Sequence, residues 1–229
     1  MFIIGGVQKS SLLDFPSKIA AIVFTQGCNF RCGYCHNAEL LDFLAETKFK
    51  EDEFFEFLGK RKGKLDGVVI TGGEPTLQRG LKDFVLKVKE MGFEVKLDTN
   101  GTNLKILKEL IEERLLDYIA MDIKAPLSKY EKITGVRVNL ENIRESINLI
   151  MASGVDYEFR TTVVKSQLSF EDFEEIGEQI KGAKKYYLQK FVPSKIYDKT
   201  LSDKTTYSDE EFKNLCENLK KYADTVDFR

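Results

Sequence analysis

The chain has 229 residues, of which 42% are hydrophobic and 31% are charged. This apolar fraction and a net charge of −2 exclude a disordered chain. The near balance of 35 basic and 37 acidic residues excludes an overall positive charge that would attract the phosphates of nucleic acid. No apolar stretch reaches about 18 residues, so we expect no membrane-spanning helix. Residues 1–6 lack the pattern of a signal peptide, so we expect a cytoplasmic protein.

Short apolar runs alternate with amphipathic segments along the chain. The runs predict six strands, at residues 19–25, 67–71, 93–98, 118–123, 157–164 and 186–192. Apolar residues at helical spacing predict helices near residues 51–59, 81–88, 104–111, 140–151, 170–180 and 212–219. Ser169 and Ser208 have the character of N-caps for the last two.

Strands that alternate with helices favour a parallel sheet built from right-handed βαβ units. Six units suit either a doubly wound sheet or an incomplete barrel, because a complete barrel usually needs about 250 residues. We find no internal repeat and no linker-like segment. The expected organisation is one domain over residues 1–229, with a core at about 18–192 and a C-terminal helix and tail at 193–229.

Polar or glycine-rich segments follow the first four predicted strands. They read GCNFRCGYCHN at residues 27–37, TGGEP at 71–75, DTNG at 98–101 and DIKAP at 122–126. In parallel α/β folds, ligands bind at the carboxyl ends of the strands. The positions of these segments therefore predict an enzyme whose site lies at that edge.

Three of the four cysteines, Cys28, Cys32 and Cys35, lie within eight residues. With His36 they could bind zinc, although two adjacent residues rarely reach one tetrahedral ion. Cys32 and Cys35 also form a C-x-x-C pair of the dithiol oxidoreductase type, which leaves Cys28 without a role. Thiolates are also the ligands that an iron–sulfur cluster needs, and three of them would leave the fourth iron open.

The fourth cysteine, Cys216, differs from the other three. It shares a helical stripe with Phe212, Leu215 and Leu219. This pattern predicts a buried core thiol rather than a cluster ligand.

The motif C-x3-C-x2-C at residues 28–35, with Tyr34 before its last cysteine, resembles the signature of the radical S-adenosylmethionine (SAM) superfamily. The GGEP motif at residues 72–75 is similar to the second hallmark of that superfamily. CNFRCGYCHN, DTNG and DIK together resemble the activating enzymes of glycyl-radical proteins, over residues 12–192. The length and the segment SLLDFP at residues 11–16 most resemble the activating proteins of anaerobic ribonucleoside-triphosphate reductase.

The resemblance implies an α/β fold, a partial (βα)6 TIM-like barrel with parallel strands. It also implies one [4Fe-4S] cluster on Cys28, Cys32 and Cys35, and reductive cleavage of SAM that generates a glycyl radical on a large partner. The expected partner is anaerobic ribonucleotide reductase, with another glycyl-radical enzyme such as pyruvate formate-lyase as the alternative. We expect an oxygen-sensitive enzyme, an electron donor such as flavodoxin or ferredoxin, and no nucleic-acid or membrane partner. A dithiol oxidoreductase or a structural metal-binding protein is the alternative of another class.

The resemblance also implies contacts with SAM. Tyr34 would lie beside the adenine, and Gly72, Gly73 and Glu74 would bind the methionine ammonium. Lys124 and Arg160 could bind the carboxylate or the ribose, and a structural ion pair is the alternative for both. A histidine that contacts SAM in the pyruvate formate-lyase activating enzyme is replaced by Val192 here, and Gln189 is a candidate substitute. We expect His36 to have no catalytic role.

The same sibling family suggests a monovalent cation site. Its ligands would be Asp98, Thr99 and Asp122, and Asp98 could also contact SAM. The alternative is that Asp98 caps the next turn and that Asp122 pairs with Lys124 or Arg160.

Overall fold

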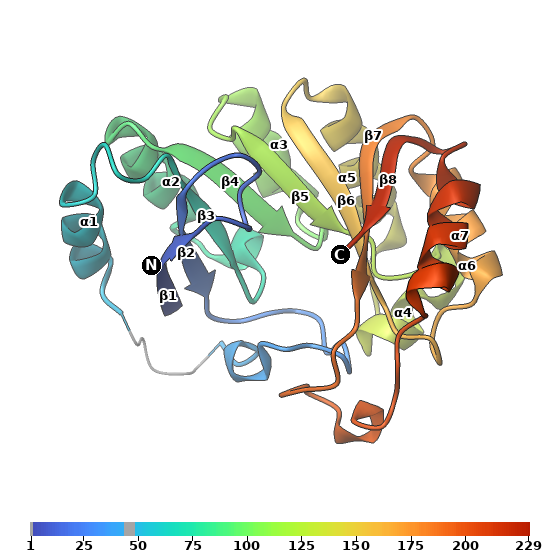
Figure 1. Cartoon of the computed structure of the whole chain (residues 1–229). Helices are drawn as coiled ribbons and strands as arrows, with labels where there is room; N and C mark the ends of the chain where they lie inside the picture. Colours follow the sequence, from blue (N-terminus) through green and yellow to red (C-terminus); the bar gives the residue numbers. More distant parts are fainter. Residues whose placement is uncertain (1, 44–48) are drawn as a thin grey trace. The chain divides into compact units, whose positions relative to one another are not determined.

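The computed structural model describes residues 2–43 and 49–229. The chain divides into two compact units (Figure 1). Unit 1 contains residues up to 29, 39–99 and 103–119, and unit 2 contains residues 30–38, 100–102 and 120–229. The predicted single domain stays a prediction. No helix in the described part of the chain is long and apolar enough to cross a membrane.

Unit 1 is built on four paired strands, β1 (Ile4–Ser11), β2 (Ala20–Thr25), β3 (Gly67–Gly72) and β4 (Glu94–Thr99). β1 runs antiparallel to β2, whereas β2, β3 and β4 are parallel. The helices of this unit are α1 (Glu51–Gly59), α2 (Leu81–Glu90) and α3 (Leu104–Glu112). The apolar stripe predicted for α2 is buried throughout. A short 3-10 helix, η2 (Pro75–Leu77), follows β3 directly, and another, η1 (Ala38–Leu40), precedes α1.

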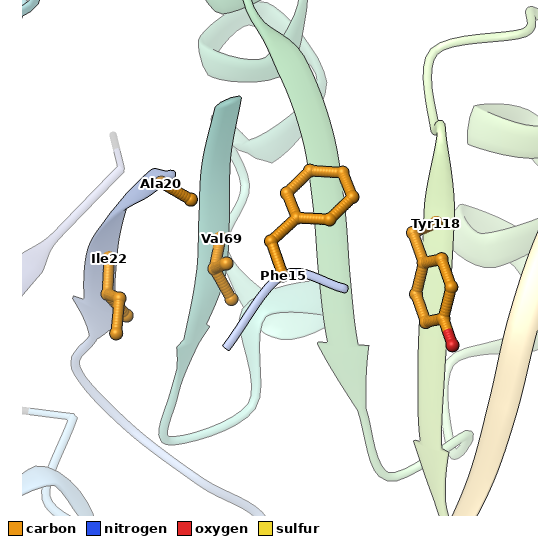
Figure 2. Packing of buried hydrophobic residues seen from close by; sticks show 5 residues of the cluster. All are labelled: Phe15, Ala20, Ile22, Val69 and Tyr118. Atoms are coloured by element: carbon orange, nitrogen blue, oxygen red, sulfur yellow. The ribbon is translucent and has the colours of Figure 1, made fainter. Parts of the chain in front are cut away.

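Phe15, in the segment before β2, belongs to a small cluster of buried apolar side chains. Figure 2 shows Phe15 with its ring between Val69 on β3 and Tyr118 on β5 (Tyr118–Asp122). Ala20 and Ile22 complete this cluster, and all five side chains are buried. The cluster lies near the amino ends of the parallel strands, so the opposite, carboxyl ends remain for the polar segments.

Unit 2 contains β6 (Asp156–Val163), β7 (Ala183–Lys190) and β8 (Ala223–Phe228), which pair in parallel. Its helices are α4 (Tyr130–Thr134), α5 (Leu140–Ala152), α6 (Phe170–Gln179) and α7 (Asp209–Leu219), with short 3-10 helices η3 (Leu127–Lys129) and η4 (Lys199–Leu201). α6 and α7 lie side by side (Figure 1). Ser169 and Ser208 form capping boxes with Asp172 and Glu211, as the N-cap prediction required.

β5 contributes to both units. At its start, Asp117 donates its backbone N–H to Val95 O at 2.9 Å, and after its end Ile123 donates to Arg160 O at 2.8 Å. The strand order of the sheet is the chain order, β1 to β8, so β1 and β8 are its two edges. The predicted α/β class with parallel strands is confirmed, and the six predicted strands correspond to β2–β7.

Three strand predictions need correction. β1 was not predicted, because its sequence IGGVQKSS has no apolar run, and it is antiparallel. β8 lies in the segment predicted as helix and tail, because only Ala223 and Val226 of this edge strand are buried. The last predicted run, residues 186–192, is displaced, since β7 ends at Lys190.

Candidate functional site

The loop after β2 carries the three clustered cysteines. Cys28 belongs to unit 1, where its backbone N–H donates to Leu41 O at 3.3 Å and the preceding Gly27 donates to Leu40 O at 2.7 Å. The chain entering the cysteine motif is therefore fixed by backbone hydrogen bonds to the segment that follows the motif. All four cysteines of the chain are thiols and none forms a disulfide.

Cys32 and Cys35 belong to unit 2, where the C-x-x-C part of the loop is a tight turn. Cys35 donates its backbone N–H to Cys32 O at 3.0 Å. Tyr197 donates to Cys35 O at 3.0 Å, and Asp198 donates to Gly33 O at 2.9 Å. A Cβ at Gly33 would lie 3.2 Å from Asp198 Cβ, so a glycine lets the two segments approach closely.

The two glycines at the end of β3 allow close backbone approach within unit 1. A Cβ at Gly73 would lie 2.1 Å from Gly27 O, and one at Gly72 would lie 2.3 Å from the backbone nitrogen of Thr25. Gly73 donates its N–H to Thr25 O at 2.9 Å, and Glu74 donates to Gly27 O at 2.8 Å. The GGE motif thus holds the backbone that leads into Cys28.

Glu74 is buried at the N-cap of η2, with 1% of its surface exposed. Its Oε1 accepts from the backbone N–H of Thr76 at 3.1 Å, the Thr76 hydroxyl at 2.6 Å and the Thr99 hydroxyl at 2.7 Å. These three donors fix the orientation of the carboxylate. Thr99, a predicted cation ligand, therefore donates its hydroxyl hydrogen bond to Glu74.

Asp98 lies at the end of β4 and binds a lysine of the same strand. Lys96 Nζ donates to Asp98 Oδ1 at 2.5 Å, and the Lys96 side chain is only 2% exposed. Lys96 was not among the predicted site residues. A lysine within the apolar run of residues 93–98, two positions before an aspartate on the same face of a strand, was the signal available.

Asp122 at the end of β5 is held by two cations of unit 2. Arg160 Nε donates to Oδ1 at 2.9 Å, and Lys124 Nζ donates to Oδ2 at 3.0 Å. Burial tends to raise the pKa of Asp122, but the charges and hydrogen bonds of Arg160 and Lys124 outweigh it and lower the pKa to about 2. The ion-pair alternative given for Asp122 is confirmed, with both candidate partners.

A second acid extends this charged group. Arg160 Nη1 also lies 4.0 Å from Glu158 Oε1, and Glu158 is 2% exposed. Glu158 Oε1 accepts from Arg229 Nη2 at 2.6 Å. Sequence reasoning missed Glu158 and Arg229, because their pairing depends on how β6 aligns with the end of the chain.

Cys32 and Tyr34 are buried near Lys124. The Lys124 Nζ lies 6.0 Å from the centroid of the Tyr34 ring, and the Tyr34 side chain is buried. Burial raises the pKa of the Cys32 thiol, although Lys124 opposes this effect.

The remaining candidates lie outside these groups. Gln189 is half-buried on β7, in register with Thr162 of β6. His36 is exposed, and its ring centroid lies 6.3 Å from that of Phe191. Cys216 is buried in α7, and burial raises the pKa of its thiol to about 11, as expected for a core thiol.

The donor set of the cysteine loop fits an iron–sulfur cluster. It consists of three thiols within eight residues, and thiolates are the ligands of such clusters. Among residues 2–43 and 49–229, no group of three or more His, Cys, Asp or Glu side chains is arranged to hold a metal ion. The fit therefore rests on the chemistry and spacing of the thiols.

Comparisons with known proteins agree with the sequence motifs. A family model described as "Radical SAM superfamily" matches residues 22–180. The chain is 37% identical to the "Putative glycyl-radical enzyme activating enzyme" of Methanocaldococcus jannaschii, over 99% of this chain and 95% of that protein. It is 32% identical to the pyruvate formate-lyase-activating enzyme of Clostridium pasteurianum, over 58% of this chain and 57% of that protein.

The fold also resembles solved structures. Streptococcus suis SuiB bound to S-adenosylmethionine matches with a TM-score of 0.63 at 15% sequence identity, over 89% of this chain and 45% of that one. At this identity the likeness bears on the fold alone, and it agrees with the predicted partial barrel.

Proposed function

The chain belongs to the radical SAM superfamily, and from this premise we propose that it generates a glycyl radical on a large partner, with anaerobic ribonucleoside-triphosphate reductase as that partner. The observation that carries the proposal is similarity over nearly the whole length to the Methanocaldococcus jannaschii protein. Similarity confined to the cysteine motif would support the superfamily but not an activating enzyme.

The family implies a [4Fe-4S] cluster and SAM. In the proposed enzyme, Cys28, Cys32 and Cys35 supply the three thiolate ligands of the cluster. When bound, the cluster and SAM supply the electron transfer and the radical chemistry. The protein contributes placement, which the backbone hydrogen bonds of Gly33 and Cys35 support.

Glu74 would bind the methionine ammonium, because three hydrogen bonds fix the orientation of its carboxylate. The close approach that Gly72 and Gly73 permit leaves strand-edge carbonyls for the same cation.

In unit 2, Tyr34 is buried beside Lys124, and its ring would contact the adenine. Lys124 and Arg160 would bind the carboxylate or ribose while sharing their charge with Asp122. Gln189 is retained as a candidate contact in place of the sibling family's histidine.

A second candidate partner is pyruvate formate-lyase, which the similarity to the Clostridium pasteurianum enzyme favours. In either case the proposed electron donor is flavodoxin or ferredoxin. The predicted monovalent cation at Asp98, Thr99 and Asp122 stays a prediction, and the partners of these three side chains bear on it below.

The chemistry is tested by anaerobic reconstitution with iron and sulfide, reduction, addition of SAM and measurement of 5′-deoxyadenosine. We expect product from the wild type and from Cys216→Ala, because Cys216 is a core thiol. We expect no cluster absorbance and no product from Cys32→Ala. Equal iron loss in both variants would contradict the assignment of the cluster to residues 28–35.

The partner is tested separately, by electron paramagnetic resonance of a glycyl radical. The reduced activating protein is mixed with SAM and either anaerobic ribonucleotide reductase or pyruvate formate-lyase. A radical on the reductase alone supports the first candidate, and a radical on the lyase alone supports the second. Deoxyadenosine without a radical on either protein would contradict both partners while leaving the radical SAM chemistry intact.

A further inference from the structure

We propose that Lys96 is a built-in counter-ion for Asp98, so that this chain needs no monovalent metal ion at that carboxylate. The inference concerns the folded chain alone and goes beyond the proposed reaction. It starts from a disagreement between the predicted cation site and the side chains that the structure places there.

Lys96 is a fully buried lysine in the middle of β4. It lies in register with Val69 of the neighbouring strand β3, and its side chain is 2% exposed. Its ammonium lies 6.0 Å from the centroid of the Tyr118 ring. Because lysine is almost never fully buried unless it is paired, this position requires an explanation.

Asp98 supplies that explanation. Residues two apart on a strand share a face, and Lys96 Nζ lies 2.5 Å from Asp98 Oδ1. The Asp98 side chain is 14% exposed, so its charge also gains little from solvent. The covalently attached ammonium satisfies this charge in the way that a bound monovalent cation would.

The other predicted cation ligands also have partners from the protein. Asp122 is bound by Arg160 and Lys124, and the Thr99 hydroxyl donates to Glu74. On this proposal, side-chain cations of the protein, rather than a bound monovalent ion, balance the charges of Asp98 and Asp122.

An ammonium on a lysine stem cannot dissociate, whereas a bound metal ion follows its concentration in solution. The chain should therefore be indifferent to the identity of the monovalent cation around it. Removal of the Lys96 ammonium should create a demand for a small cation, because it leaves a buried carboxylate without this counter-charge.

The test is thermal unfolding of the full chain without cluster or SAM, so it does not depend on the radical chemistry. Choline chloride is replaced by KCl or NaCl at constant ionic strength. We expect the wild-type midpoint to be the same in all three salts. A wild-type unfolding midpoint that rises with KCl or NaCl and then saturates would overturn the proposal.

Two variants sharpen the result. Lys96→Met should unfold at lower temperature in choline chloride and regain stability in KCl or NaCl with saturation. Lys96→Met/Asp98→Asn should lose that response and be more stable than Lys96→Met in choline chloride. A double variant no more stable than the single one would also overturn the proposal.

Lys89→Met is the matched control, because Lys89 binds Asp117 in a pair that is about 30% exposed. Water can solvate the carboxylate of Asp117 when Lys89 is removed. We therefore expect a smaller decrease of the unfolding midpoint and no dependence on the identity of the cation. If Lys96→Met does not fold, the wild-type comparison still decides the question.

Discussion

Glu74 and Asp122 are two carboxylates that follow strands of the same sheet, and they are held in opposite ways. The three hydrogen bonds to Glu74 Oε1 come from hydroxyl and amide groups, which carry no net charge. Asp122 is bound by a guanidinium and an ammonium. The Oε1 atom of Glu74 is oriented by hydroxyl and amide donors, whereas both carboxylate oxygens of Asp122 bind side-chain cations.

This difference separates two roles that the sequence alone does not distinguish. A carboxylate that neutral donors hold can still attract a cationic ligand such as an ammonium group. A carboxylate between two cations mainly fixes the positions of those cations. The contrast agrees with the proposed roles, in which Glu74 binds a cationic ligand and Asp122 positions Lys124 and Arg160.

The largest expected effect is the contrast between two charge-removing variants. Asp122→Asn should lower the free energy of unfolding by about 3 kcal/mol, because Arg160 and Lys124 would lose a buried anion. Glu74→Gln should cost only about 1 kcal/mol, because a neutral amide oxygen can still accept from neutral donors. Urea denaturation measures both free energies of unfolding. Equal decreases in the two variants would contradict the difference between Glu74 and Asp122.

The pH dependence of unfolding gives the next largest effect. The pKa of Asp122 is about 2 in the folded chain and about 3.8 when the chain is unfolded, so the folded chain binds fewer protons. Its contribution, about 2 kcal/mol, is therefore complete above pH 4 and is lost as the pH falls through about 2. Asp122→Asn should reduce the acid-induced loss of stability by that amount. An unchanged pH profile in Asp122→Asn would contradict the assignment.

Thr99→Val should have the smallest effect, about 1 kcal/mol, because it removes one donor from Glu74 and leaves the two from Thr76. Thr99→Ser keeps a hydroxyl and should recover most of the loss. Denaturant unfolding measures the difference. A Thr99→Val loss as large as that of Asp122→Asn would mean that Thr99 has a further structural role.

Local patterns were enough to predict much of the fold. The apolar runs of β2 to β6 and the helical stripes of α2 and α7 depend on neighbours in sequence, so they were readable without tertiary information. β1 and β8 were not predicted, because edge strands bury few side chains. They are held by backbone pairing with β2 and β7.

The sequence predicted which segments carry the polar residues of the candidate site, but not which side chains bind one another. Its polar segments follow β2, β3, β4 and β5 as expected. The hydrogen bond from Thr99 to Glu74, and the link from Arg229 to Glu158, join residues far apart in sequence. Such links depend on strand register, which the composition of a segment does not specify.

The anchoring of the C-x-x-C turn has a consequence for the order of folding. The carbonyls of Gly33 and Cys35 accept hydrogen bonds from Asp198 and Tyr197, which are separated from them by most of the chain. During synthesis from the N-terminus, the cysteines emerge long before these two donors exist. Contacts of such sequence separation form late, because the intervening chain must first lose conformational freedom. The turn thus completes its shape only after β7, so assembly of a cofactor on a finished turn is a late event in the maturation of the protein.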